Sequence, residues 1–218
     1  MAEVQLSGRR SPMGDVTRHF LRNKLAMAGL IIVALLVFTA IFASLLAPRD
    51  PAQQNLEDKR MPPGAEYPLG ADEFGRDILS RVIYGTRVAL FGAVTAVAIA
   101  MLLGVSMGIL AGFIGGWLDT LLMRVTDIML AFPYLLLAIA IVAALGTGLQ
   151  NTTLAVGIWA TPAFARLARS QVIGLKNREY VTAAQALGAP SQRIILRHVL
   201  PNTIPSIIVF ASLYMANA

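Results

Sequence analysis

Segment 175–201 carries the residues whose types and spacing most clearly indicate a task. A short helix is predicted from about Glu179 to Leu187, because Glu179 suits the positive end of a helix and Gly188 suits the left-handed residue that follows one. Asn177 is its expected N-cap. The apolar positions i, i+3, i+4 and i+7 of this helix share one face and are Tyr180, Ala183, Ala184 and Leu187. A face with large residues at its ends and small ones between them fits a groove in another protein better than it fits lipid.

A second short helix is predicted from Pro190 or Ser191, with Arg193 and Arg197 on one side, and Pro201 marks the expected turn back into the membrane. These residue types indicate binding to another protein rather than catalysis. The sequence has no Gly-x-x-x-x-Gly-Lys-[Ser/Thr] phosphate loop and no nucleophile–base constellation. We therefore expect a protein that is not itself an enzyme and that binds no cofactor and no metal.

The composition points to a membrane protein. Of the 218 residues, 56% are hydrophobic and only 14% are charged, and the mean hydropathy is +0.67. Soluble domains carry about 25% charged residues, so an ordinary cytosolic enzyme and a disordered chain are excluded. The absence of cysteine excludes a secreted disulfide scaffold. The net charge of +6 is expected to record membrane topology rather than nucleic-acid binding.

Apolar helices must position the recognition segment. The run Leu25–Ala47 holds 23 residues without a charge, and as a helix it reaches roughly 34 Å, enough for a hydrocarbon core of about 30 Å. It is too long for the core of a signal peptide, so a retained span is favoured over a cleaved signal. Turn formers at 146–153 divide a later run into a hairpin whose second helix has Asn151 or Thr152 as its expected N-cap. The predicted spans are 25–47, 88–116, 119–145, 152–174 and 202 onward.

These spans predict an all-α, polytopic membrane helix bundle with about five spans. The final run, Pro201–Ala218, is still apolar at its last residue. The simplest interpretation is a span cut at its C-terminal end, so the chain is expected to be a fragment.

The distribution of basic residues predicts the orientation. Residues 1–24 hold five basic and two acidic residues, and residues 166–200 hold six basic residues against Glu179 alone. The loop 48–87 is nearly balanced, with six basic and seven acidic residues. Because basic loops remain on the cytoplasmic side, we expect a cytoplasmic N-terminus and an extracytoplasmic 48–87 loop.

Within this loop, an amphipathic helix is predicted over 72–87, with Asp72 as its cap and an Asp77–Arg81 pair at i,i+4. Its apolar stripe consists of Phe74, Ile78, Leu79, Val82 and Ile83. The helix is expected at the outer membrane surface or on a neighbouring subunit, and a solvated linker with a short helix is the alternative.

Three features of the spans concern packing. The row Gly104, Gly108 and Gly112 leaves a flat stripe on which another helix can approach closely. Arg124 and Asp127, three residues apart, predict an ion pair near the headgroups, and a role in transport is the alternative. Pro133 and Pro162 are expected to kink their helices.

Segment 175–201 resembles the cytoplasmic signature of the permease subunits of bacterial ATP-binding-cassette importers. That signature reads Glu-Ala-Ala, three residues, Gly, nine residues, Ile, one residue, Leu-Pro. The chain has the same spacing in Thr182-Ala183-Ala184, Gly188, His198 and Leu200-Pro201. Thr182 replaces the usual acid, for which Glu179 one turn earlier is a substitute, and His198 replaces the usual Ile. His198 and two further segments, 23–51 and 68–81, resemble the dipeptide/oligopeptide branch, in particular its second ("C") permease subunits.

The resemblance implies a type I permease fold. It implies a cytoplasmic tail 1–24, a first transmembrane helix 25–47, an extracytoplasmic loop 48–87, and a transmembrane domain 88–218 that lacks its C-terminal end, with a coupling loop 175–201. The coupling residues would be Glu179, Tyr180, Thr182, Ala183, Ala184, Leu187, Gly188, His198, Leu200 and Pro201. The implied setting is the bacterial inner membrane. The implied partners are a homologous permease, two cytoplasmic ATPases that hold ATP and Mg²⁺, an extracytoplasmic solute-binding protein and a di- or oligopeptide.

Three alternatives remain at this point. Nickel-chelate and glutathione importers share these motifs. An ion-coupled secondary transporter should show carboxylates at mid-span, and the uncharged runs contain none. A structural membrane scaffold would explain the glycine row but not a capped helix at this spacing in a basic loop.

Overall fold

A computed structural model describes residues 20–216 of the protein, so most of the predicted tail 1–24 lies outside the described residues. All regular elements in the described range are helices, and the one extended pairing there is an isolated bridge between Ala71 and Asp77. The all-α prediction is therefore confirmed. The chain divides into two compact units, Met1–Leu90 and Phe91–Ala218.

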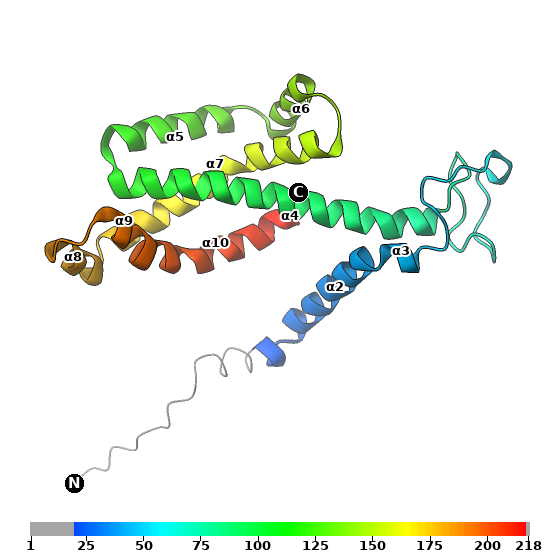
Figure 1. Ribbon diagram of the computed structural model, residues 1–218, viewed down its shortest axis with the longest axis horizontal. Coiled ribbons are helices and arrows are strands. Elements are labelled where there is room, and N and C mark those ends of the chain that lie inside the picture. The colour runs from blue at the N-terminus through cyan, green and yellow to red at the C-terminus, as the bar shows by residue number, and fades with distance from the viewer. Residues whose placement is uncertain (1–19, 217–218) are drawn as a thin grey trace, which may run out of the picture. The chain divides into compact units, whose positions relative to one another are not determined.

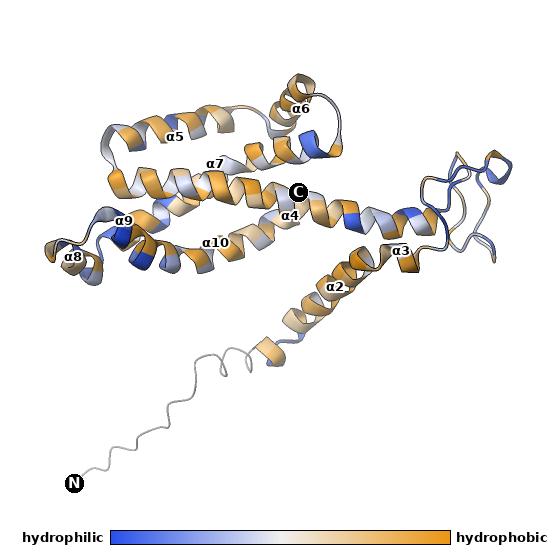
Figure 2. Ribbon diagram, viewed as in Figure 1, coloured by the Kyte–Doolittle hydropathy of each residue, from blue (hydrophilic) through white to orange (hydrophobic). Residues whose placement is uncertain are grey.

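An apolar helix in the described part of unit 1 has little protein around it. Helix α2 (Lys24–Ile41) is capped by Asn23, whose Oδ1 accepts hydrogen bonds from the N–H groups of Leu25 (3.1 Å) and Ala26 (3.2 Å). The short helix α3 (Ala43–Leu46) follows. Only 6% of α2 is buried, and Figure 2 shows it hydrophobic along its length. A bare apolar helix of this kind is suited to lipid.

The loop after α3 is held by a polar cluster around Tyr67, whose ring is buried. Arg49 donates from Nη1 to the Tyr67 hydroxyl (2.7 Å) and from Nη2 to Glu66 (2.9 Å). The Tyr67 hydroxyl in turn donates to Asp58 (2.7 Å), at the end of the 3₁₀ helix η1 (Leu56–Asp58). This hydrogen bond to Asp58 is the main reason that the pKa of Tyr67 is raised, and burial adds to it. The loop is thus an ordered structure.

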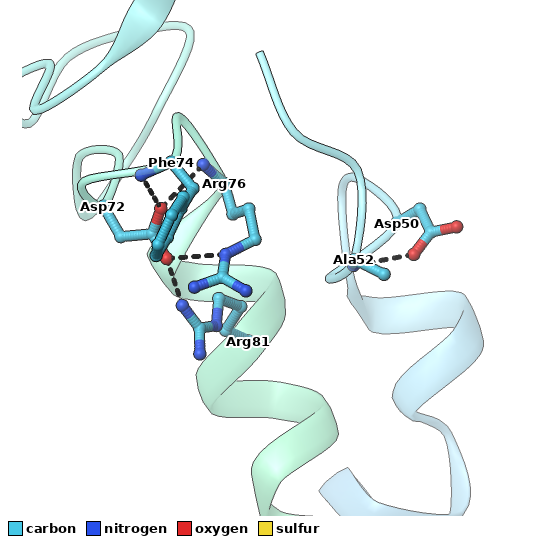
Figure 3. A network of polar contacts seen from close by, with 6 residues as sticks. All are labelled: Asp50, Ala52, Asp72, Phe74, Arg76 and Arg81. Atoms are coloured by element: carbon cyan, nitrogen blue, oxygen red, sulfur yellow. Dashed lines mark hydrogen bonds and ion pairs between the residues drawn. The ribbon is translucent and has the colours of Figure 1, made fainter. Parts of the chain in front are cut away.

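A second polar network orders the end of the loop (Figure 3). Asp72 accepts hydrogen bonds from the N–H groups of Phe74 (2.8 Å) and Arg76 (3.0 Å), and its carboxylate also pairs with the guanidinium groups of Arg76 and Arg81. Burial alone would raise the pKa of Asp72, but these hydrogen bonds and the Arg76 charge outweigh it and hold the pKa well below its usual range.

The predicted helix over 72–87 was wrong in its start and in its ion pair. Helix α4 begins at Ile78, because Asp72 is committed to a tight turn and Gly75 has a left-handed φ of 70° that no helix accepts. Asp77 caps the helix instead, since its Oδ2 accepts from the Ser80 N–H (2.9 Å) and hydroxyl (2.5 Å). Arg81 pairs with Asp72 rather than with Asp77.

Helix α4 (Ile78–Ile114) then runs for 37 residues without a break. The expected division between a surface helix ending at 87 and a span starting at 88 is absent from this helix. The reason is local: no proline lies between Ile78 and Ile114, so every turn after the first can keep its hydrogen bond.

The predicted span 119–145 is not one helix. Helix α5 (Gly116–Ala131) and helix α6 (Tyr134–Leu145) meet at 97°. The sharp change of direction between them can be followed in Figure 1. Pro133 has no N–H to donate and forces the preceding Phe132 into an extended conformation with ψ 135°. The proline therefore breaks the helix instead of only kinking it.

Helix α7 (Leu149–Lys176) follows the predicted turn, but its cap differs from the prediction. Gly148 occupies the N-cap position without a side-chain hydrogen bond. Asn151 instead donates from Nδ2 to the carbonyl groups of Leu145 (2.8 Å) and Gly146 (3.0 Å) and so caps the preceding helix α6.

The last elements form one helical rod after a short helix. Helix α8 (Glu179–Ala186) precedes α9 (Ser191–Ile194), the π-helical turn η2 (Ile195–Val199) and α10 (Leu200–Met215). Pro201 was expected at a turn, but it lies inside the rod, in the first turn of α10. The wide turn of η2 makes room for the proline ring and places the Leu200 N–H on the Ile195 carbonyl.

Among the described residues, three helices are long and apolar enough to cross a membrane. These are Lys24–Ile41, Ile78–Ile114 and Ser191–Met215, and α5 with α6 makes a fourth if the bent pair counts as one span. Helix α7, which contains the predicted span 152–174, is long enough to cross a membrane but is not among these helices, because it holds more polar and charged residues than they do.

The contact between α4 and α7 forms a large part of the core of unit 2, to which α8, α9, η2 and α10 also contribute. The row Gly104, Gly108 and Gly112 of α4 faces α7 so closely that added Cβ atoms would meet its backbone. At Gly108, for instance, a Cβ would overlap the Ala165 carbonyl oxygen and lie 2.7 Å from the Cβ of Ala168. Van der Waals contact along this stripe is what holds two apolar helices together in lipid.

Candidate functional site

Helix α8 begins at the predicted Glu179 and ends at Ala186, one residue before the predicted Leu187, and its N-terminal cap differs from the prediction. Gly188 follows the helix with a left-handed φ of 76°, and its N–H donates to the Gln185 carbonyl (2.9 Å). Arg178, not Asn177, occupies the N-cap position, and its side chain makes no cap hydrogen bond. Glu179 is in the first turn, where its charge favours the helix N-terminus.

One side of α8 is anchored in the core of unit 2. Val181 is fully buried and belongs to a core cluster that includes Ile194 of α9 and Val199 of η2. Ala184 is partly buried against the same cluster. The predicted four-residue face is therefore divided, because Ala184 turns toward the core.

The other side of α8 presents apolar side chains to the exterior. Leu187 is 88% exposed and Tyr180 is 44% exposed, and Ala183 between them is exposed as well. Exposed large apolar residues on a helix that is fixed from behind are typical of a docking surface. We call these three residues, Tyr180, Ala183 and Leu187, the α8 face.

The remaining predicted residues lie around this face in different ways. Thr182 is exposed and donates its hydroxyl to the carbonyl groups of Arg178 (3.0 Å) and Glu179 (3.1 Å). The His198 ring is 6.1 Å from the Tyr180 ring. Leu200 and Pro201 lie one and two residues beyond η2, at the start of α10. The residues of the motif over 182–201 therefore lie in two helical regions, α8 with Gly188 after it and η2 with the start of α10, and do not form one cluster of side chains.

A hollow of about 680 Å³ opens beside the α8 face. It is lined by Leu175, Asn177, Arg178, Glu179, Tyr180 and Asn202. A partner's side chain could enter it next to Tyr180, with charges of both signs at its rim.

Helix α7 connects this region to α5 through two ion pairs. Arg169 donates from Nε and Nη2 to the two carboxylate oxygens of Asp119 (2.6 and 2.7 Å), and Arg166 donates to Asp127 (2.7 Å). The predicted Arg124–Asp127 pair was therefore wrong, because Asp127 faces α7. Arg124 makes no ion pair with any residue in the described range.

At the end of α7, Lys176 donates from Nζ to the Phe113 carbonyl (2.6 Å) at the end of α4. A cation at this place satisfies a free carbonyl and favours the negative end of the helix. The ends of α4 and α7 are thus joined next to α8, and sequence spacing gave no indication of this contact.

A larger cavity, of about 890 Å³, lies between α6, α7 and α10. Its aromatic residues are Tyr134, Trp159 and Tyr214, its hydroxyl residues include Thr147 and Thr152, and no charged residue lines it. Sequence reasoning missed this cavity, although aromatic and hydroxyl residues inside uncharged runs were a visible signal. Among the described residues, no group of His, Cys, Asp and Glu is suited to hold a metal.

Two known protein families match parts of the chain. The family described as binding-protein-dependent transport system inner membrane component matches residues 104–218. The N-terminal TM domain of oligopeptide transport permease C matches residues 11–63.

Several permeases are similar over most of the chain. The dipeptide transport system permease protein DppC of Alkalihalophilus pseudofirmus is 45% identical over 95% of this chain and 68% of its own length. The glutathione transport system permease protein GsiD of Pectobacterium atrosepticum is 41% identical over 94% of this chain and 68% of its own length. The di/tripeptide transport system permease protein DppC of Pseudomonas aeruginosa is 44% identical over 95% of this chain and 71% of its own length. The chain therefore belongs to the inner membrane components of binding-protein-dependent transport systems, as an ATP-binding-cassette importer permease of the dipeptide and glutathione transport family.

Proposed function

We propose that the chain forms half of a translocation pathway for di- and oligopeptides and takes its driving force from cytoplasmic ATPases through the α8 face. The observation that carries this proposal is the exposure of Leu187 on a short helix whose opposite side is buried in the core. Outside the membrane, exposed apolar side chains on a helix that is anchored from behind are typical of a surface that docks on another protein. ATP and Mg²⁺ would be held by the ATPases, and this chain would not be an enzyme.

The charge distribution supports a cytoplasmic position for α8. The segment 166–200 is basic, as is the N-terminal segment, and the loop 48–87 is nearly neutral. With basic segments inside, α8 meets the ATPases, and the ordered loop around Tyr67 faces the side on which a solute-binding protein delivers substrate. The proposed location is the bacterial inner membrane, with the N-terminus in the cytoplasm.

The large cavity supports a place for this chain in the pathway. Its lining of aliphatic and aromatic residues, with two threonines and no charge, suits weak contact with many side chains. A homologous permease would close the other half of the path, and motion between inward-open and outward-open states would move the substrate. Relatives named for glutathione transport make a glutathione importer the second candidate.

Cross-linking in membranes that contain the whole assembly tests the docking surface. Leu187→Cys is expected to cross-link to an ATPase subunit, and Gln150→Cys, which is also exposed but lies at the opposite end of α7, is expected not to. Absence of any Leu187→Cys product would refute the proposal. In the reconstituted assembly, uptake that follows an ion gradient instead of ATP would identify a secondary transporter. Competition between dipeptides, glutathione and a nickel chelate would identify the substrate.

A further inference from the structure

Four contacts tie the part of α7 nearest α8 to its neighbours. Arg169 holds Asp119 with two hydrogen bonds, Arg166 holds Asp127, and Lys176 holds the end of α4. The fourth is the close approach of Gly112 to Arg169, where an added Cβ would lie 3.0 Å from the Arg169 carbonyl oxygen. Only Asn177 and Arg178 separate α7 from α8. A displacement of α8 is therefore passed to this part of α7 across two residues, in addition to α9 and η2, against which α8 packs.

The two ion pairs are placed so that they resist rotation as well as sliding. The acids 119 and 127 lie eight residues apart on α5, which is about 12 Å along a helix, while Arg166 and Arg169 are one turn apart on α7. The arginine side chains therefore diverge to reach them. One contact between two helices permits a pivot, and two contacts about 12 Å apart do not.

The pairs end where both helices are weakened. The break between α5 and α6 follows Asp127 at Phe132–Pro133, and Pro162 lies one turn before Arg166 in α7. Beyond these prolines, α6 is held to α7 by different contacts, namely the Asn151 cap and the Tyr134–Trp159 rings at 5.3 Å. The structure therefore contains a stiff part on the α8 side of the prolines and a separate part around the large cavity.

From this arrangement we infer that Asp119 and Asp127 are positioning residues that make α5 move as one body with the α8 end of α7. Movement of α8 then reaches the bend between α5 and α6 and, through it, the wall of the cavity. This inference rests on the proposed function, because it assumes that α8 is the element the ATPases move.

The Asp119–Arg169 pair carries the larger share of this role. Its side chains are 21% and 34% exposed, against 51% and 55% for Asp127 and Arg166, and it is the bidentate pair. Less exposed, bidentate pairs are screened less by water and fix geometry better. Arg124 of α5 lines a small surface pocket together with Asp119 and Arg169, but it pairs with no acid among the described residues. It therefore serves as the matched control.

The experiment uses the complete transporter reconstituted in vesicles, with uptake and ATP hydrolysis measured on the same preparation. Asp119→Asn is expected to lower the uptake per ATP hydrolysed about five- to tenfold, at the lower end of what coupling between distant sites provides. Arg124→Gln should leave this ratio unchanged. The charge-exchanged double variant Asp119→Arg with Arg169→Asp should restore most of it, because the pair is rebuilt with its ends reversed.

The possible outcomes separate this inference from the proposed function. An assembled Asp119→Asn transporter with the wild-type ratio would overturn the inference, as would a double variant that assembles and is no better coupled than Asp119→Asn. If Asp119→Asn does not assemble, the double variant decides alone: assembly with a restored ratio supports the inference, and failure overturns it. Cross-linking of Leu187→Cys in each preparation reports separately on docking, so its loss in the wild-type background would refute the proposed function instead.

Discussion

The contact between α4 and α7 permits a quantitative test with one substitution at two glycines of the same helix. Gly108→Ala places a Cβ against the Ala165 carbonyl oxygen and the Cβ of Ala168, whereas a Cβ at Gly85 meets no described atom within 4 Å. Both substitutions gain helix propensity, about 1 kcal/mol each. Only Gly108→Ala also overpacks the interface.

The overpacking term is expected to be about 1–3 kcal/mol. The upper half of that range applies here, because the opposing atoms are a backbone oxygen and a Cβ, neither of which can rotate away. Gly85→Ala should therefore be neutral or slightly stabilising, and Gly108→Ala should be less stable than Gly85→Ala by about 2 kcal/mol.

The assay is unfolding of the purified chain in mixed detergent micelles, followed by circular dichroism as the denaturing detergent is increased. The difference between the two alanine variants isolates the steric term, since the change in side chain is the same. Equal stability of the two variants would mean that the backbones of α4 and α7 do not meet at Gly108, and the packing described for unit 2 would be wrong.

Three further results are expected. Gly188→Val forces a β-branched residue into φ 76°, so it should displace α8 and lower uptake more than ATP hydrolysis. Gly188→Asn should be tolerated, because Asn accepts this conformation. Equal transport by the two variants would show that a left-handed residue is not needed at this position. Asp72→Ala should speed protease cleavage of the loop 48–77 at pH 7, and Glu73→Ala should not. Folding lowers the pKa of Asp72, so the ionised carboxylate stabilises the loop above its ordinary pKa of about 4, and this effect is lost as the pH falls through the folded pKa. The cleavage rates of wild type and Asp72→Ala should therefore become equal only in strong acid. Equal rates already near pH 5 would contradict the assignment. Gln54→Cys should be labelled by an impermeant thiol reagent from outside and Asn177→Cys only after permeabilisation, and the reverse pattern would refute the proposed topology.

Local chemistry was enough to predict the helical class and, to within one residue, the limits of α8. Long uncharged runs can cross lipid only as helices, because every backbone N–H and C=O must then be satisfied within its own segment. Glu179 and Gly188 set the ends of α8 through interactions with adjacent backbone alone. The family resemblance rests on the same kind of local pattern, and residues 11–63 and 104–218 match the family descriptions.

The ion pairs could not be predicted from spacing along one helix. Arg124 and Asp127 are close in sequence, yet Asp127 pairs with Arg166, and Arg81 pairs with Asp72 across a turn. A charged side chain takes the partner that the packing brings within reach, and long arginine side chains reach several candidates. The adjacency of α5 and α7 therefore decided which charges are neutralised.

Proline and capping residues show the same division. The sequence determined that Pro133 and Pro201 lack an N–H, but not whether the chain would break, as at Phe132, or widen into a π turn, as before Leu200. It also placed Asn151 at a turn without determining which helix it would cap. The sequence determines which donors, acceptors and charges each residue carries. The choice among competing partners is made by the surrounding helices, because a hydrogen bond or an ion pair forms only where the fold brings donor and acceptor together, and that choice was decided by the tertiary structure alone.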